Sequence, residues 1–365
     1  MSKILILANY DGGLYHFRLE LVQKLVKDGH HVVVSCPYGI YTDKIISEGC
    51  EYKVTPIARH GMNPVKECVL IAKYIKLIND VKPDVVLSYT VKPNIYGGIA
   101  CSLTKTPYIA NITGLGTAIE NGGLIQKILC VLYKIGLRKA HKVFFQNTSN
   151  EQFFASQNMY NDKHIIIPGS GVNIQRYSPL EYPVDSETIK FLMIARIMKD
   201  KGIDEYLSAA EYIKAKYPNT EFHICGFCEP EYENKMDEIK NKGTVVYHGM
   251  VQNVRGLLQE THCTVLPSYH EGMANVLLES ASSARPVVAT NIPGCRETFD
   301  EGVSGFGCEV KSAQSLIDAI EKFLSLTYEE KVKMGIAGRQ KVEKCFDRQI
   351  VVEAYIKEIN AILNK

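Results

Sequence analysis

The sequence lacks long hydrophobic runs, low-complexity segments and short repeats. No uninterrupted apolar run approaches the roughly 18 residues that a membrane-spanning helix needs, so we expect no transmembrane segment. Met1-Ser2-Lys3 leads directly into an apolar stretch, without the pattern of a secretory leader. No short fixed period is present, which argues against a solenoid. We therefore expect a globular cytoplasmic protein.

A large excess of charge of one sign is also missing, but the charge is unevenly distributed. The net charge of +2 argues against a nucleic-acid partner. Residues 1–180 hold 20 Lys and Arg against 12 Asp and Glu, a net charge of +8, whereas 22 and 28 in the remainder give −6. A basic first half predicts an anionic partner for that half, either membrane lipid or a phosphorylated acceptor.

Cysteine occurs 11 times, but in no convincing disulfide or metal pattern. The odd number and the scattered positions are typical of buried thiols in a reducing compartment. Cys225 and Cys228 have CxxC spacing, but neither a thioredoxin-like context nor a second ligand pair accompanies them. We expect no bound metal and no cofactor.

Strand-like and helix-like stretches alternate along most of the chain. The opening shows the pattern: an apolar run at 3–8, a loop containing Gly12-Gly13, a helix at 16–27 and a strand at 31–35. Near-continuous apolar strands are typical of a parallel sheet covered on both faces. A turn-rich segment at 168–183 separates two such series. The sequence thus predicts two Rossmann-like doubly wound α/β domains, residues 1–170 and 185–346, with a ligand at the carboxyl ends of the strands.

Two carboxylates in one strand–loop–helix segment are the first candidates for chemistry. Glu271 and Glu279 are eight residues apart, which would place them on one face of a helix two turns apart. A helix that begins between them would direct free N–H groups at an anion. This segment suits a phosphorylated sugar, but two solvated glutamates at an ordinary helix start explain it equally well.

Two cations and a glycine pair follow the first strands of the two domains. Arg196 and Lys201 lie between a predicted strand and a predicted helix, so they would stand at the strand's carboxyl end. An Arg fork and a Lys point charge suit a diphosphate, and two ordinary surface charges are the alternative. Gly12-Gly13 would let backbone approach a phosphate or would form a plain turn. No G-x-G-x-x-G motif accompanies them, which disfavours a dinucleotide site.

Together these residues resemble family 4 of the retaining glycosyltransferases, over nearly the whole chain. Within the family, they are similar to the branch that extends lipid-linked sugars in bacterial surface-polysaccharide and protein-glycosylation pathways, including N-acetylgalactosaminyltransferase-type enzymes. The resemblance is carried by Arg196-x4-Lys201-Gly202, Pro267-Ser268-x2-Glu271-Gly272, Glu279, Arg285-Pro286-Val287-Val288-Ala289-Thr290, Pro293-Gly294-Cys295-x-Glu297, Tyr15-His16-Phe17-Arg18, Lys92-Pro93-Asn94 and Gly114-Leu115-Gly116.

This resemblance implies the two-domain architecture called GT-B, in which the domains face across a cleft. The first domain would bind the acceptor and the second the nucleotide-sugar, and a last helix at 347–365 would cross back to the first domain. It also implies a metal-independent enzyme, and the sequence contains no Asp-x-Asp triplet.

The resemblance also implies roles for individual residues. Arg196 and Lys201 would hold the donor diphosphate and stabilise the charge on the leaving nucleotide, and Glu271 would lie by the sugar hydroxyls. Glu279 would take the ribose hydroxyls. The other implied donor contacts are the N–H groups of Met273, Ala274 and Asn275, the stretch from Gly249 to Gln252 near the base, and Gly12 and Gly13 from the first domain.

One position departs from the family pattern. Many members carry a histidine after the strand that matches 108–111, whereas this chain continues Asn111-Ile112-Thr113-Gly114. We therefore predict no general base, because in a retaining front-face reaction a leaving-phosphate oxygen can accept the proton. His16 and Glu120 are candidates for acceptor contacts.

The stretch at 124–142 is predicted to be a basic amphipathic helix. Its predicted apolar face includes Leu124, Ile128 and Leu132, and Lys127, Lys134 and Arg138 recur on another face. Such a helix suits an anionic leaflet, although a core helix with a solvated polar face has the same pattern.

The predicted function is transfer of a hexose or N-acetylhexosamine from a UDP-sugar to a lipid-linked glycan acceptor. The enzyme would be a retaining glycosyltransferase, peripheral on the inner face of the membrane. A non-hydrolysing UDP-sugar epimerase and a non-catalytic glycosyltransferase-like subunit remain as alternatives.

Overall fold

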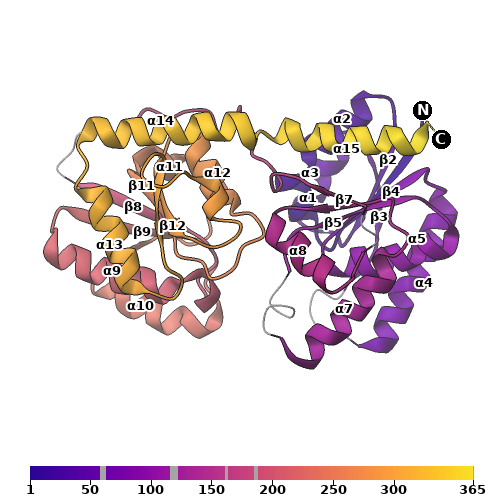
Figure 1. Ribbon diagram of the computed structural model, residues 1–365, viewed down its shortest axis with the longest axis horizontal. Helices are drawn as coiled ribbons and strands as arrows, with labels where there is room; N and C mark the ends of the chain where they lie inside the picture. Colours follow the sequence, from indigo (N-terminus) through magenta and orange to yellow (C-terminus); the bar gives the residue numbers. More distant parts are fainter. Residues whose placement is uncertain (58–62, 116–121, 161–162, 185–187, 365) are drawn as a thin grey trace. The chain divides into compact units, whose positions relative to one another are not determined.

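The computed structural model describes residues 1–57, 63–115, 122–160, 163–184 and 188–364. The chain divides into two units, Met1–Ser170 with Arg348–Lys365, and Gly171–Asp347 (Figure 1). Each unit contains a parallel sheet with helices around it, so the prediction of two Rossmann-like α/β domains is confirmed. The turn-rich stretch belongs largely to the second unit, where Val172 N–H donates to Phe346 O at 2.9 Å.

The first unit is organised on a sheet with strand order β3-β2-β1-β4-β5-β6-β7. Its strands are parallel, and the apolar residues of the five inner strands are buried because helices cover both faces, whereas Val54 of β3 and Ile166 of β7, at the two edges, are exposed. Its elements are β1 (Lys3–Leu7), α1 (Asp11–Phe17), α2 (Leu19–Lys27), β2 (His31–Cys36), α3 (Thr42–Ile46), β3 (Glu51–Val54), α4 (Pro64–Val81), β4 (Val85–Tyr89), the π-helical turn η1 (Pro93–Gly97), α5 (Gly98–Thr104), β5 (Tyr108–Ile112), α7 (Gly123–Leu137), β6 (Lys142–Phe145), α8 (Thr148–Ser156), β7 (His164–Ile166) and α15 (Arg348–Leu363).

The last helix, α15, returns to the first unit, as the resemblance implied. It lies along α2 (Figure 1). Tyr355 of α15 is buried, and its hydroxyl accepts a hydrogen bond from Asn111 Nδ2 at 2.6 Å. Arg348 donates from Nη1 to both carboxylate oxygens of Glu20 at 2.8 Å. The polypeptide end therefore supplies part of the core on which β1 and β5 rest.

The second unit has the strand order β10-β9-β8-β11-β12-β13, again with parallel pairs. Its core combines residues of β8, β9 and β11 with α9 and α13. Its elements are β8 (Ile189–Ile194), the 3₁₀ turn η2 (Lys199–Lys201), α9 (Ile203–Lys216), β9 (Thr220–Cys225), η3 (Pro230–Tyr232), α10 (Glu233–Asn241), β10 (Val246–Tyr247), α11 (Arg255–Glu260), β11 (Cys263–Leu266), α12 (Asn275–Ser282), β12 (Val287–Thr290), η4 (Arg296–Thr298), β13 (Gly305–Cys308), α13 (Ala313–Leu324) and α14 (Tyr328–Cys345).

The segment after β1 differs from its prediction. The expected single helix at 16–27 is two helices, α1 and α2, which meet at Arg18 with φ −136°. Gly12 and Gly13 lie in the first turn of α1 rather than in a loop. Two strands, β3 and β13, were not predicted, because their sequences Glu-Tyr-Lys-Val and Gly-Phe-Gly-Cys lack an apolar run.

The cysteines are all free thiols, and Cys225 is buried while Cys228 is partly buried. Within the described parts of the chain, no helix combines the length and the apolar character needed to cross a membrane.

Candidate functional site

The carboxyl ends of two neighbouring strands, β8 and β11, bring the two main sequence motifs of the second unit together. These strands pair in parallel, so the loops that follow them emerge at the same edge of the sheet. Gly202, after η2, has φ +69°, and a Cβ atom there would lie 2.0 Å from Pro267 O. Only glycine allows this approach of the two loops. Tyr269 N–H also donates to Asp200 O at 2.9 Å.

Lys201 and Glu271 form the central contact of the site. Lys201 Nζ donates to Glu271 Oε1 at 2.6 Å, and Ser268 Oγ donates to the same oxygen at 2.9 Å. The two charged side chains are only 20% and 15% exposed. Because a half-buried ion pair is screened little by water, the partners hold each other in a fixed place. A diphosphate that reached this edge would share Lys201 with Glu271.

Arg196 follows the end of β8 but contacts a different carboxylate. Its Nη1 lies 3.2 Å from Glu229 Oε1, and the side chain is 59% exposed. Such an exposed pair contributes little to stability, typically below about 1 kcal/mol. Arg196 can therefore leave Glu229 at small cost when an anion binds. The two predicted cations share one sheet edge, but each is held by its own carboxylate.

The helix start between the two glutamates differs from its prediction in two ways. Helix α12 begins at Asn275, four residues after Glu271, so the expectation that Glu271 and Glu279 share one helix face is wrong. Ala274 N–H is not directed at a ligand, because it donates to Gly294 O at 2.8 Å. Gly294 has φ +87°, and a Cβ atom there would be 2.7 Å from Glu271 O.

Asn275 retains features of a ligand contact. Its Oδ1 is buried and has no hydrogen-bond partner among the described residues, while its Nδ2 donates to Met273 O at 3.3 Å. The N–H groups of Asn275 and Val276 are in the first turn of α12 and have no acceptor within the helix. An unsatisfied buried acceptor costs free energy unless a donor reaches it. A hydroxyl of a bound ligand would satisfy it.

Several residues of the site were not assigned to it from the sequence. Glu297 accepts the N–H of Gly294 at 2.7 Å and so fixes the loop behind Glu271. Tyr269 OH donates to Glu205 Oε1 at 2.7 Å and orients the loop before Glu271. The sequence motif Pro293-Gly294-x-x-Glu297 pointed to the contact of Glu297 with Gly294. No sequence motif pointed to Glu205.

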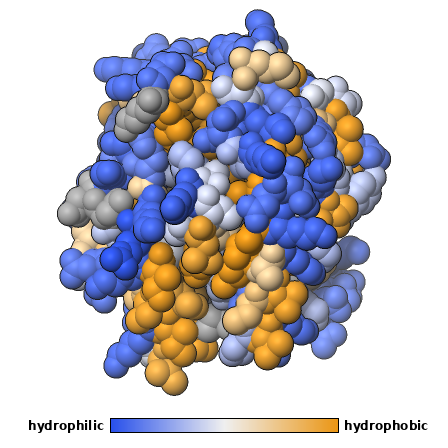
Figure 2. All heavy atoms as spheres, turned by 90° about the vertical axis from the view of Figure 1, so that its right-hand side faces the viewer, coloured by the Kyte–Doolittle hydropathy of each residue, from blue (hydrophilic) through white to orange (hydrophobic). Residues whose placement is uncertain are grey.

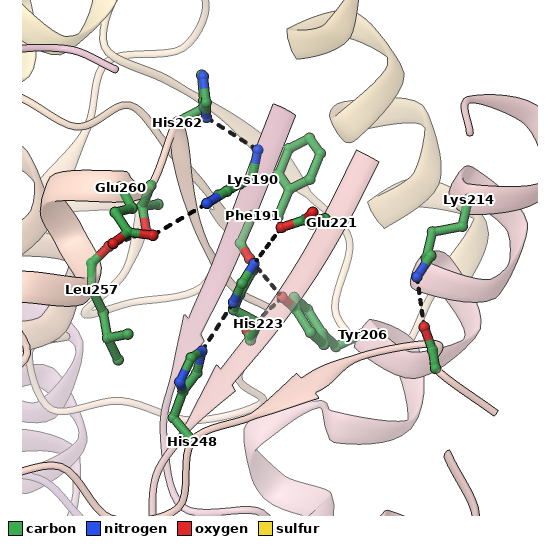
Figure 3. Close-up of polar contacts among 12 residues, drawn as sticks. Lys190, Phe191, Tyr206, Lys214, Glu221, His223, His248, Leu257, Glu260 and His262 are labelled. Atoms are coloured by element: carbon green, nitrogen blue, oxygen red, sulfur yellow. Dashed lines mark hydrogen bonds and ion pairs between the residues drawn. The ribbon is translucent and has the colours of Figure 1, made fainter. Parts of the chain in front are cut away.

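A histidine pair is formed by His223 of β9 and His248, which directly precedes the predicted base-binding stretch in the sequence (Figure 3). The rings of His223 and His248 stack with centroids 5.2 Å apart, and His223 Nδ1 is 2.9 Å from His248 Nε2. His223 Nε2 is 3.2 Å from Glu221 Oε2. Burial lowers the pKa of His223. Gly249, next to His248, has φ +66° and accepts the N–H of Gly226 at 2.8 Å, while Gln252 is exposed.

The remaining predicted residues belong to the first unit. The N–H of Gly12 already donates to the buried Asp11 carboxylate at 2.8 Å, so it is not free for a phosphate, and Gly13 adjoins it in the same turn. His16 lies edge-on to Tyr41 with ring centroids 4.7 Å apart. Glu120 lies outside the described residues. A diphosphate contact from Gly13 and an acceptor contact from His16 stay predictions.

Comparisons with known proteins identify the family of both domains. Residues 3–147 match the model of a glycosyl transferase 4-like domain, and residues 179–341 match that of glycosyl transferases group 1. The second match spans Arg196, Lys201, Glu271 and Glu279.

Two characterised relatives and one solved structure illustrate the similarity. The N,N'-diacetylbacillosaminyl-diphospho-undecaprenol alpha-1,3-N-acetylgalactosaminyltransferase of Campylobacter jejuni is 27% identical, over 99% of this chain and 99% of the relative. The UDP-Gal:alpha-D-GlcNAc-diphosphoundecaprenol alpha-1,3-galactosyltransferase of Escherichia coli is 24% identical, over 73% and 72%. Anabaena Alr3699/HepE, solved in complex with UDP-glucose, has a TM-score of 0.81 and 16% identity, over 99% and 100%.

Proposed function

The chain belongs to the glycosyltransferases, with a glycosyl transferase 4-like first domain and a group 1 second domain, and from this premise we propose a specific reaction. It transfers a hexose or N-acetylhexosamine from a UDP-sugar to a lipid-linked glycan acceptor, with retention of configuration and without a metal ion. The observation that carries the proposal is the Lys201–Glu271 pair at the carboxyl edge of the second sheet, beside the orphaned acceptor of Asn275.

The donor diphosphate would lie against Lys201 and Arg196. As the bond to the sugar C1 breaks, negative charge develops on the leaving diphosphate. The two cations would stabilise this charge more strongly in the transition state than in the ground state, which lowers the barrier. A carboxylate only accepts hydrogen bonds, so Glu271 would receive the hydroxyls of the sugar. Asn275 Oδ1 would accept a hydrogen bond from another group of the ligand. Glu279, one turn into α12, would take the ribose hydroxyls.

The proton step needs no base from this chain. The acceptor oxygen bonds to C1 on the face from which the diphosphate leaves, and its proton passes to the departing phosphate oxygen. Retention follows because the new bond occupies the face of the old one. The choice of a lipid diphosphate acceptor rests on the two relatives, whose names both give one. The choice of UDP rests on the name of the Escherichia coli relative and on UDP-glucose in HepE.

Substitutions at the central contact test the reaction. We expect Lys201→Ala to lower kcat by about 10²–10³-fold, as removal of one charge-stabilising donor does elsewhere. Glu271→Gln should lower kcat/KM as well, because an amide replaces an acceptor-only carboxylate. The measurement is product formation from UDP-N-acetylhexosamine and a synthetic lipid diphosphate sugar. Lys214→Ala is the matched control, since Lys214 lies near the end of α9 and its Nζ donates to Gly243 O at 2.6 Å.

Two results would contradict the assignment. Wild-type turnover in both Lys201→Ala and Glu271→Gln would remove the site from the reaction. Conversion of the UDP-sugar in the absence of any acceptor would indicate an epimerase instead.

We further propose that helix α7 places the enzyme on an anionic leaflet. Five apolar side chains of α7, here called the apolar stripe, are 43–74% exposed: Leu124, Ile125, Ile128, Val131 and Ile135. Lys127 and Lys134 lie on the same helix beside them. Figure 2 shows hydrophobic side chains gathered at the lower edge of one side of the molecule, where α4 and α7 lie in Figure 1. Exposed apolar residues flanked by cations are typical of interfacial helices.

Vesicle flotation tests this attachment. Ile128→Asp with Val131→Asp should reduce binding to vesicles containing phosphatidylglycerol by at least about tenfold, because each buried aliphatic side chain contributes about 1.5–3 kcal/mol. Exposed Val303→Asp and Val310→Asp in the second unit are the control. Equal flotation of both double variants would rule the stripe out.

A further inference from the structure

The two histidines of the second sheet form a hydrogen bond that the proposed transfer reaction does not use. His223 lies on β9, and His248 directly follows β10, the strand that pairs with β9 in parallel (Figure 3). His223 Nδ1 is 2.9 Å from His248 Nε2, and the His223 side chain is only 15% exposed. Because this bond joins two titratable rings, its existence depends on how many protons the pair carries.

A carboxylate fixes the tautomer of the pair. His223 Nε2 lies 3.2 Å from Glu221 Oε2, and a carboxylate only accepts hydrogen bonds, so this nitrogen carries a proton. In neutral His223, Nδ1 is then an acceptor, and the N–H at His248 Nε2 donates to it. One added proton leaves this bond intact, because a protonated His248 still donates to a neutral His223. A second proton places one N–H against another and breaks the bond.

The charges on the neighbouring elements act on the pair in opposite directions. Glu221 of β9 favours a protonated His223, whereas Lys190 of β8, itself 3.2 Å from Glu260 of α11, disfavours it. Burial lowers the pKa of His223, and the nearby His248 lowers it further. A second proton on the pair therefore binds only below the ordinary histidine pKa of about 6.5.

The backbone connects the histidine pair to the carboxyl edge of the sheet. Gly249, next to His248, accepts the N–H of Gly226 at 2.8 Å. Gly226 has φ +151°, and a Cβ atom there would lie 1.8 Å from the carbonyl oxygen of Ala195, which directly precedes Arg196. The loops that follow β8, β9 and β10 are thus in direct contact. This is the edge at which nucleotides bind in doubly wound folds, so a displaced His248 would disturb it.

We propose that His223 and His248 are positioning residues for the nucleotide base, and that a second proton on the pair releases the loop after β10. Nucleotide affinity then falls in acid, because the nucleotide binds the form with the intact hydrogen bond more tightly than the form without it. This inference rests on the proposed UDP-sugar donor and on the predicted base contact of residues 249–252. A purely structural pair would change the stability in acid but not the nucleotide affinity of the folded protein.

Full-length His248→Gln separates the two roles. The amide of glutamine can donate to His223 Nδ1, and it can turn its oxygen towards a protonated His223, so the bond persists at every pH. Isothermal titration calorimetry with UDP, from about pH 8 to about pH 5, measures the affinity. We expect wild type to lose about three- to tenfold more affinity over this range than His248→Gln, which corresponds to one hydrogen bond. The titration of UDP itself is common to both proteins and cancels.

Two further variants complete the comparison. His248→Leu removes the donor at every pH, so it should bind UDP about three- to tenfold more weakly than wild type even near pH 8. The loss should be restored in His248→Gln, and in turnover it should appear in KM rather than in kcat. His31→Gln is the control, because His31 Nε2 also lies near a carboxylate, 3.1 Å from Glu51 Oε2, but in the first unit. It should keep the wild-type pH profile.

Each outcome decides the inference. A pH profile of UDP affinity that is the same in wild type and His248→Gln overturns the positioning role and leaves the proposed transfer reaction untouched. Equal UDP affinity in all variants, with only the melting temperature changed, makes the pair structural and also overturns it. No UDP binding by wild type at any pH would contradict the proposed donor, and the inference would fall with it. Circular dichroism at each pH identifies unfolding, and if His248→Leu is unfolded the comparison with His248→Gln decides alone.

Discussion

Arg285 shows how a motif residue can act through the fold rather than through the ligand. It is fully buried, and its guanidinium donates to carbonyls of Leu258 at 2.8 Å, Glu181 at 2.7 Å and Leu180 at 3.2 Å. Burial lowers its pKa to about 10, which still leaves it charged at neutral pH. The guanidinium thus ties the stretch before β8 to α11. The sequence motif identified the position, but only burial revealed its structural role.

His262 makes the stability of the second unit depend on pH. It is buried, and its Nδ1 accepts the N–H of Lys190 at 3.1 Å, as Figure 3 shows. Burial, together with the charges of Arg285, Lys331 and Lys190, lowers its pKa from 6.5 to about 4. Between pH 6.5 and about 4, His262 is therefore protonated in the unfolded chain but neutral in the folded chain. Stability is fully present above pH 6.5 and is lost as the pH falls towards 4.

We expect His262 to lower the unfolding free energy of the second unit by about 2 kcal/mol between pH 7 and pH 5. In His262→Asn, the amide oxygen can still accept from Lys190 N–H but cannot titrate, so this share of the loss disappears. Hydrogen exchange of amides in β8 and β11 gives the free energy at each pH. His270→Asn, at an exposed position, should keep the wild-type slope. An identical slope in wild type and His262→Asn would refute the assignment.

At the scale of elements, the loop after β8 and the loop after β11 depend on one glycine. Gly202→Ala would carry both the penalty of φ +69° and a clash of its Cβ with Pro267 O at 2.0 Å. We expect a loss of at least about 2 kcal/mol and a fall in turnover, because the Lys201–Glu271 contact would shift. Gly243→Ala is the matched control, since it has φ +67° but nothing within 4 Å of the added atom. Chemical denaturation and the transferase assay measure both effects. Equal losses in the two variants would mean that the close approach is unimportant.

The sequence predicted most elements, because buried parallel strands are apolar runs between turn residues. It located Lys201 and Glu271 near the ends of strands, but it did not show that they bind each other. That contact needs the pairing of β8 with β11, which lie about 70 residues apart in the sequence. Ala274 was misassigned for a similar reason, since its N–H partner Gly294 comes from a separate loop. Local sequence patterns predict helices and strands, whereas tertiary contacts decide which backbone and side-chain groups already have a hydrogen-bond partner.

At the scale of the whole molecule, the chain leaves the first unit at Ser170 and re-enters it at Arg348. The return of the last helix to the first unit was implied only by the family resemblance. The physical reason is that α15 has apolar residues on more than one side, and four of them are almost fully buried in the first unit: Val351, Val352, Tyr355 and Ile359. The two ends of the polypeptide therefore share one core.

This topology predicts that the first unit needs the end of the chain in order to fold. A chain ending at Asp347 would expose the four apolar contacts of α15, each of which contributes about 1.5–3 kcal/mol, in a domain whose total stability is about 5–15 kcal/mol. It would also leave Glu20, which is 15% exposed, without Arg348. We expect hydrogen exchange to show lost protection in β1, β4 and β5, with β8, β9 and β11 unchanged. Tyr355→Phe, which removes the hydroxyl that bonds to Asn111, Tyr89 and Arg18, should cost the first unit about 1–3 kcal/mol. Native protection of the first sheet in the shortened chain would show that α15 is a peripheral helix.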